Sequence, residues 1–116
     1  MHELSLVTSL LEIVDDHAKR HGFNRVTGLK LSFGKCSGIE PAALRFAFEV
    51  QSRGGMAEGA VLEFDIRPPI VYCFSCRQAF EQPAGATGCP ACSGEEIILA
   101  GGTEGLTLLE MEVEQE

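Results

Sequence analysis

The stretch YCFSCRQAFEQPAGATGCPACSG, residues 72–94, decides the fold because it interrupts a regular sequence with four cysteines in two C-x-x-C pairs. Cys73 and Cys76 form the first pair, and Cys89 and Cys92 form the second. Each pair presents two thiolates from one tight turn, and two such turns facing each other complete the sulfur tetrahedron of structural Zn²⁺. A segment of about 30 residues cannot bury a sufficient apolar core, so metal binding must supply much of its folding free energy.

Other uses of these cysteines fit the sequence less well. Two disulfides would require an oxidising compartment, which nothing else in the chain indicates. A thioredoxin-like redox pair would follow a strand and open a helix, and only Pro90 inside the second pair suggests one. Four thiolates also fill a tetrahedral site, so no position stays open for a substrate or a water. We therefore predict a structural metal, no catalytic residue and no enzyme activity.

Helix and strand patterns lie on both sides of this stretch. Apolar residues recur at three- and four-residue steps over 4–22, which predicts an amphipathic helix, and Pro41 begins a second helix over 41–53. Alternation with period two predicts strands over 25–34, 61–67 and 106–114, the last with Leu109, Met111 and Val113 between glutamates. One-faced elements of this kind form an α+β layer, with two helices on a three-stranded, mainly antiparallel sheet.

The breaks in these patterns give the domain organisation. Pro68-Pro69 ends the second strand, and Gly101-Gly102 precedes the last one. The sequence therefore predicts a zinc-ribbon module, residues 69–100, inserted into a loop of an α+β domain that combines residues 1–68 with 101–116.

Composition limits the classes of partner. The 116 residues are 45% hydrophobic and 22% charged, with a formal net charge of −8. An acidic chain without a basic run argues against nucleic acid and fits protein partners or cations. No stretch approaches the roughly 18 uninterrupted apolar residues of a membrane span, and no secretory signal precedes the first helix. We expect a cytoplasmic protein.

The first three residues, MHE, supply the elements of a chelate. A bulky residue at position 2 is expected to leave Met1 in place. The α-amine of Met1, the backbone nitrogen of His2 and its imidazole then close a five- and a six-membered ring on one metal. Square-planar nitrogen donors suit Ni(II) or Cu(II). The fourth ligand stays open: the Glu3 backbone, a carboxylate such as Glu3 or Glu40, or a recipient protein.

The pattern as a whole resembles the HypA/HybF family of hydrogenase nickel incorporation proteins. The resemblance covers essentially the full chain. It rests on MHELSL at the start, GKCSGIEPAALRFAFE and EGAVLEFD in the middle, YCFSC with CPAC in the insert, and AGGTEGLTLLEMEVE at the end. The sequence departs from the family at Arg77 and Ser93, where a glycine often follows the second cysteine of a pair.

The resemblance implies a metallochaperone that delivers Ni(II) for [NiFe]-hydrogenase maturation. His2, with backbone nitrogens at the start of the chain, would bind nickel, and the four paired cysteines would hold Zn(II). The implied partners are a HypB-type GTPase, the hydrogenase large subunit and, in some organisms, urease accessory proteins.

The residues by themselves are also compatible with two other classes of protein. An acidic zinc-ribbon adaptor that binds protein or nucleic acid would need the four cysteines but no nickel. A zinc enzyme would need an open ligand position. The sequence leaves undecided whether the protein is a monomer or a homodimer, and what Cys36, Glu40, His17 and His21 do.

Overall fold

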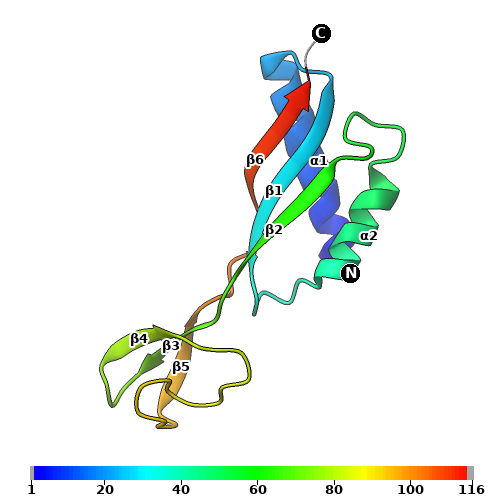
Figure 1. Ribbon diagram of the computed structural model, residues 1–116. Helices are drawn as coiled ribbons and strands as arrows, with labels where there is room; N and C mark the ends of the chain where they lie inside the picture. Colours follow the sequence, from blue (N-terminus) through cyan, green and yellow to red (C-terminus); the bar gives the residue numbers. More distant parts are fainter. Residues whose placement is uncertain (1, 115–116) are drawn as a thin grey trace.

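The chain folds into two helices and six strands arranged around two separate sheets (Figure 1). The computed structural model describes residues 2–114, with side chains from Glu3 onward. The elements in chain order are α1 (His2–His21), β1 (Arg25–Gly34), α2 (Pro41–Gln51), β2 (Val61–Arg67), β3 (Ile70–Cys73), β4 (Gln78–Glu81), β5 (Ile97–Gly101) and β6 (Thr107–Glu114). Both predicted helices and all three predicted strands are confirmed.

The larger sheet has the order β2-β1-β6 and is mixed. β1 pairs with β2 in parallel, from Gly28 opposite Val61 to Gly34 opposite Arg67, and it pairs with β6 antiparallel. Parallel neighbours need a crossover connection, which α2 supplies between β1 and β2. The predicted α+β class is confirmed, with one parallel and one antiparallel pair where a mainly antiparallel sheet was expected.

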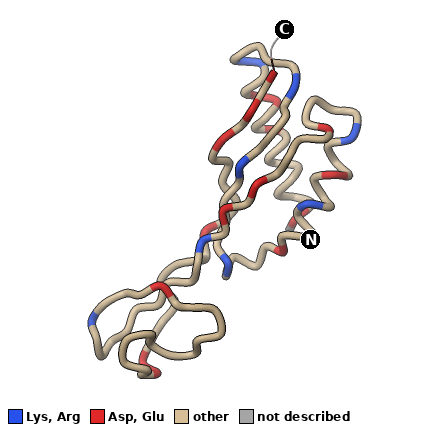
Figure 2. Tube along the Cα trace, viewed as in Figure 1, with Lys and Arg blue, Asp and Glu red and all other residues tan. Residues whose placement is uncertain are grey.

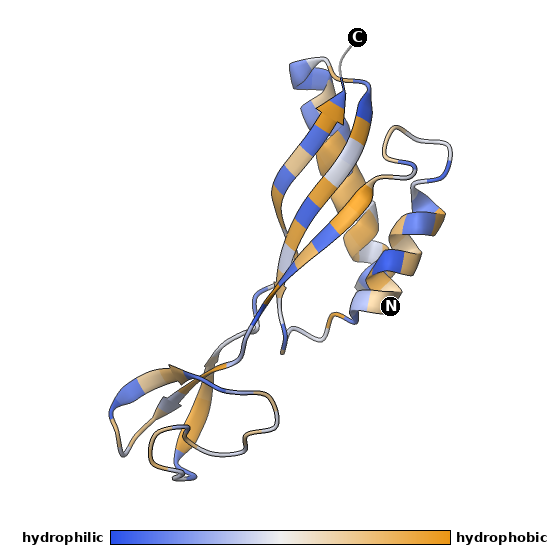
Figure 3. Cartoon of the chain, viewed as in Figure 1, coloured by the Kyte–Doolittle hydropathy of each residue, from blue (hydrophilic) through white to orange (hydrophobic). Residues whose placement is uncertain are grey.

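Both helices cover one face of this sheet and form the core with it (Figure 1). Hydropathy alternates along the three strands, as expected for a sheet with one buried and one solvated face (Figure 3). The most deeply buried large side chains of the core are Val7, Val14, Val26, Leu31, Phe33 and Leu44. On the opposite face Lys30 lies between Glu63 and Glu110 in the strand register, and Figure 2 shows charged residues of both signs along these strands.

β6 departs from the predicted alternation because it contains a register shift. Leu31 pairs with Leu108 and Lys30 with Glu110, which leaves Leu109 without a partner on β1. Leu109 is 41% exposed, whereas Leu108 packs against the core. The prediction that Leu109 shares the face of Met111 is therefore wrong, because a bulge places an extra residue at this point.

The insert contains a second sheet with the order β4-β3-β5, in which β3 pairs antiparallel with both neighbours. It extends away from the first sheet, so the molecule is elongated, at 57 × 26 × 18 Å (Figure 1). These three strands have four or five residues each, too short to show a hydrophobic period in the sequence.

Tight backbone packing holds the junction between the two sheets. Gly34 N donates to Glu104 O at 2.8 Å, and Cys36 N donates to Gly102 O at 2.7 Å. A Cβ on Gly34 would overlap the Gly102 carbonyl, and Gly102 itself has φ +86° beside Pro68. Glycine is needed at both positions because no side chain fits between the crossing segments.

Candidate metal centres

The four paired cysteines form one compact cluster at the end of the second sheet. Their sulfur atoms all lie within 4.8 Å of one another, and Cys73 and Cys89 are buried. Cys73 Sγ lies 3.7 Å from Cys92 Sγ, and Cys76 Sγ lies 3.9 Å from Cys89 Sγ. A tetrahedral ion with metal–sulfur bonds of about 2.3 Å requires sulfur separations of roughly 3.8 Å. The cluster therefore has the dimensions of a four-thiolate metal site.

The two turns that carry the cysteines are alike. Arg77 N donates to Cys73 O at 2.8 Å, and Ser93 N donates to Cys89 O at 2.9 Å. Both Arg77 and Ser93 have positive φ, at 58° and 62°. The two residues that depart from the family pattern thus adopt the left-handed conformation that glycine accepts at no steric cost. Arginine and serine adopt this conformation at the expense of backbone strain.

Backbone N–H groups point at the sulfur atoms and favour negative charge there. The N–H groups of Cys76, Ala91 and Gly94 each donate to a cysteine sulfur at 3.4 Å. These bonds prepare the cluster for thiolates, the form that binds metal.

The cluster ionises unevenly without a cation. Hydrogen bonding to Cys92, followed by burial, raises the pKa of Cys76 to about 12. Burial raises the pKa of Cys89, but backbone N–H donors outweigh it and lower the pKa to about 7. Four adjacent thiolates repel one another, so a bound divalent cation is the group that lets all four ionise together.

The predicted nickel site lies at the start of α1. Met1 and the side chain of His2 are outside the described part of the structure, so their place as ligands stays a prediction. Glu3 is described: its Oε2 accepts a hydrogen bond from Glu40 N at 3.1 Å. Glu40 in turn caps α2, with its Oε1 accepting from Ala42 N at 3.0 Å. The structure therefore brings Glu40 beside Glu3 in the first turn of α1, although the two residues are 37 positions apart in the sequence.

The sequence did not indicate that a side chain of α2 is hydrogen-bonded to the first turn of α1. Gln51 Nε2, at the end of α2, donates to the Leu4 carbonyl at 2.9 Å. The Thr8 hydroxyl lies 2.9 Å from Gln51 Oε1 and 3.0 Å from the same carbonyl. The sequence predicts a helix that includes Gln51, but nothing in it indicates a partner 47 positions away.

The remaining candidates lie apart from the cysteine cluster. Cys36 is exposed in the turn after β1. His17 and His21 lie on α1 with their rings stacked, 6.0 Å between centroids. Among the described residues the four cysteines form the only group of three or more side chains placed to share a metal ion.

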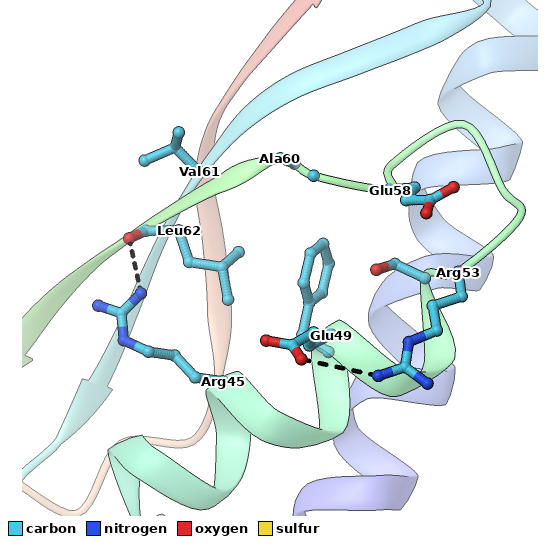
Figure 4. Close-up of a pocket in the computed structure, with 10 residues that line it drawn as sticks. Arg45, Glu49, Arg53, Glu58, Ala60, Val61 and Leu62 are labelled. Carbon is cyan, nitrogen blue, oxygen red and sulfur yellow. Dashed lines mark hydrogen bonds and ion pairs between the residues drawn. The ribbon is translucent and has the colours of Figure 1, made fainter.

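A cleft of about 450 Å³ lies between α2 and the start of β2 (Figure 4). Its charged side chains are engaged with the protein: Arg45 Nη1 donates to Leu62 O at 3.2 Å, and Arg53 pairs with Glu49 at 3.7 Å. No cysteine or histidine lines it.

Comparison with known proteins gives a match over nearly the whole chain. The family described as "Hydrogenase/urease nickel incorporation, metallochaperone, hypA" matches residues 1–113. The hydrogenase maturation factor HypA of Syntrophus aciditrophicus is 49% identical over 114 residues, covering 98% of this chain and 100% of the relative. HypA of Paracoccus denitrificans is 44% identical over 97% of this chain and 99% of its own length. HybF of Salmonella typhimurium is 39% identical over 98% of this chain and 100% of its own length.

Solved structures share the fold. The solution structure of the Ni metallochaperone HypA from Helicobacter pylori superposes with a TM-score of 0.64 at 24% identity, covering 98% of both chains. A second solution structure, of a HypA protein, gives a TM-score of 0.69 at 24% identity, over 100% of this chain and 98% of the other.

Proposed function

This chain belongs to the HypA family of nickel metallochaperones for hydrogenase maturation, and on that premise we propose that it carries Ni(II) at the start of α1 and holds Zn(II) in the four-cysteine cluster. One observation carries the proposal. The family match runs from residue 1 to residue 113, so it includes both the MHE terminus and the complete cysteine cluster. It is a carrier and not an enzyme.

The proposed nickel ligands are the Met1 amine, backbone nitrogens and the His2 imidazole. α1 begins at His2, and the first four N–H groups of a helix have no intrahelical acceptor. Deprotonating the His2 and Glu3 amides therefore breaks no hydrogen bond of the helix. Each amide that loses its proton also brings a negative charge, which offsets the unfavourable interaction between a cation and the positive end of the helix dipole.

We propose the Glu3 carboxylate as a further nickel ligand, after the nitrogen donors of Met1 and His2, with Glu40 beside it. The hydrogen bond between Glu3 Oε2 and Glu40 N keeps the carboxylate close to the chain terminus. A carboxylate offers about four lone-pair sites on its two oxygens, so accepting this bond is compatible with metal coordination. The recipient protein replaces such a ligand more easily than a backbone nitrogen, which suits a site that must release its cargo.

We propose a structural Zn(II) in the cysteine cluster and a matching division of the chain. Residues 69–100 form the zinc-binding domain, and residues 1–68 with 101–116 form the nickel-binding domain. Four thiolates at tetrahedral spacing favour zinc and leave no ligand position open, which suits a metal that stays in place. The metal that is delivered is then the one at the start of α1, and not the zinc.

The proposed partners follow from hydrogenase maturation. They are a HypB-type GTPase and the hydrogenase large subunit, with urease accessory proteins as further candidates, and we propose that the protein acts in the cytoplasm without nucleic acid or membrane. The net charge of −8 supports a protein partner with a basic surface. None of the described helices is long and apolar enough to cross a bilayer.

Metal analysis of three proteins tests both sites: the native chain, His2→Ala, and a chain with one extra residue before Met1. We expect one tightly held zinc per chain in all three, and loss of tight nickel binding in the last two, because each change removes a ligand. Equal nickel affinity in the extended protein would exclude the terminal chelate, and zinc that varied with these changes would exclude separate sites.

We further propose that the two sites are coupled through residues 35–40. At one end of this segment Cys36 N is bonded to Gly102 O at the junction, and at the other Glu40 N is bonded to Glu3 Oε2. A change in the zinc domain that moves Gly102 is thereby passed to the nickel terminus. Equal nickel affinity in the intact protein and in a chain lacking the zinc domain would contradict this coupling.

A further inference from the structure

The end of α1 carries two histidines one helical turn apart. His17 and His21 differ by four residues, so their side chains leave the same side of the helix. Their rings lie 6.0 Å apart between centroids and only 15° from parallel. His21 is exposed and His17 half-buried, so the pair is open to solvent. No part of the proposed chaperone mechanism uses them.

We propose that His17 and His21 form a second binding site for a divalent transition metal, separate from the N-terminal chelate and from the cysteine cluster. Imidazole is a ligand for Ni(II), Cu(II) and Zn(II), and two histidines four apart on a helix bind one ion through one nitrogen each. Water completes the coordination sphere. The chemical class of the ligand is thus a hydrated divalent cation of the later first transition series.

The separation of the rings suits chelation. Metal–imidazole bonds of about 2.0–2.1 Å bring two ring centroids to roughly 4.5–5 Å. The observed 6.0 Å is closed by rotations about the side-chain bonds of both histidines, without a change in the helix backbone. An ion held by both imidazoles must lie in the plane of each ring, so the near-parallel rings must also turn about their side-chain bonds before their nitrogen atoms converge.

The position in the helix also favours a cation. Both histidines lie in the last two turns of α1, where the free carbonyl groups give the helix dipole its negative end. Two cations lie between them in sequence: Lys19, two residues from each histidine, projects from a different side of the helix, whereas Arg20 is three residues from His17 and next to His21. The net charge of −8 raises the local concentration of cations around the whole molecule.

The two proposed nickel positions therefore occupy opposite ends of one helix. The 15 to 19 residues of α1 between His2 and the two histidines place the sites roughly 25 Å apart, so they cannot share an ion. The terminal site has backbone donors and a deprotonation step, whereas the histidine site has two neutral imidazoles and exchangeable water. The second site binds more weakly and exchanges faster, which suits metal capture.

The test uses the zinc-loaded full chain, titrated with Ni(II) alone and followed by calorimetry. The background carries one residue before Met1 together with His2→Ala, which removes the terminal chelate. We expect this protein to keep one weak binding event and to lose it on His17→Gln combined with His21→Gln. Glutamine keeps the helix and the polarity but is a poor metal ligand. Lys19→Gln, in the same turn, is the matched control and should keep the event.

Two outcomes of the titration would contradict the proposed histidine site. One is unchanged weak binding after both histidines are replaced. The other is an extended, His2→Ala protein that binds no nickel at all. As a second readout, paramagnetic Ni(II) should broaden the imidazole NMR signals of His17 and His21 before those of other residues, and signals that stayed sharp at saturation would also contradict it. Tight binding that survived the N-terminal changes would instead refute the terminal chelate, so the two proposals fail separately.

Discussion

At the scale of single residues, the cysteine cluster shows how much a motif can predict. The spacing of the two C-x-x-C pairs predicted a four-sulfur group, and the structure brings Cys73, Cys76, Cys89 and Cys92 within 4.8 Å of one another. The conformation of the following residues was not predictable, because arginine and serine at Arg77 and Ser93 do not indicate positive φ. The folded turns override the local preference of these residues.

Replacing Arg77 by glycine should stabilise the metal-bound module. Arg77 has φ 58°, and removing its Cβ relieves a left-handed strain worth about 1–2 kcal/mol, partly offset by the greater freedom of glycine in the unfolded chain. We expect a gain of about 0.5–1 kcal/mol, measured as slower zinc loss to a chelator. Gln78→Gly, in the adjacent strand, is the control and should destabilise. Faster zinc loss from Arg77→Gly would contradict the strain.

At the scale of elements, side chains on α2 fasten the start of α1. The sequence predicted both helices, but it began the first at residue 4, two residues later than the structure, where α1 starts at His2. That extension is supported by tertiary contacts: Glu40 beside Glu3, and Gln51 with Thr8 on the Leu4 carbonyl. Partners so far apart in the chain leave no periodic signal in a single sequence.

Gln51→Ala should loosen the contact between the two helices. The substitution removes the donor to the Leu4 carbonyl and the acceptor facing Thr8, and each hydrogen bond contributes about 1 kcal/mol. We expect a loss of about 1–2 kcal/mol in the free energy of unfolding, measured by urea denaturation. Glu49→Ala, which breaks an exposed ion pair, should change it by less than about 0.5 kcal/mol. Equal effects of the two changes would argue against the clamp.

Removing zinc should unfold one sheet and leave the other. The sheet β4-β3-β5 has few buried side chains besides Val71 and the cysteines, whereas the larger sheet has its own core with both helices. A chelator is therefore expected to collapse the NMR dispersion of residues 70–101 while the helical circular dichroism signal is kept. A parallel loss of the helical signal would mean that the larger sheet depends on the metal.

At the scale of the whole molecule, the sequence predicted the interrupted α+β organisation but not the strand pairing. Pro68-Pro69 and Gly101-Gly102 predicted the position of the insert, because prolines and glycines interrupt a strand pattern in the sequence. The parallel pairing of β1 with β2 depends on α2 crossing over between them, a choice that one-faced patterns do not contain. Leu109 shows the same limit, since a bulge depends on the partner strand.

Gly34→Ala should destabilise the molecule at the junction. A Cβ there would overlap the Gly102 carbonyl, and backbone on both sides cannot yield as a flexible side chain would. We expect a loss of about 1–3 kcal/mol in the free energy of unfolding, measured by thermal and urea denaturation. Gly105→Ala, whose Cβ would meet nothing within 4 Å, is the matched control and should be nearly neutral. A neutral Gly34→Ala would show that the junction adapts.

The pairing of β6 with β1 also has a kinetic consequence. β6 is the last strand made, and it reaches β1 only after the chain has returned through the whole insert. Once the insert is folded around the metal, Ile70 lies opposite Gly101. The connection from β2 to β6 then consists only of residues 68–69 and 102–106, on either side of this pair. Shorter loops cost less entropy to close, so zinc uptake should accelerate completion of a sheet that it does not touch.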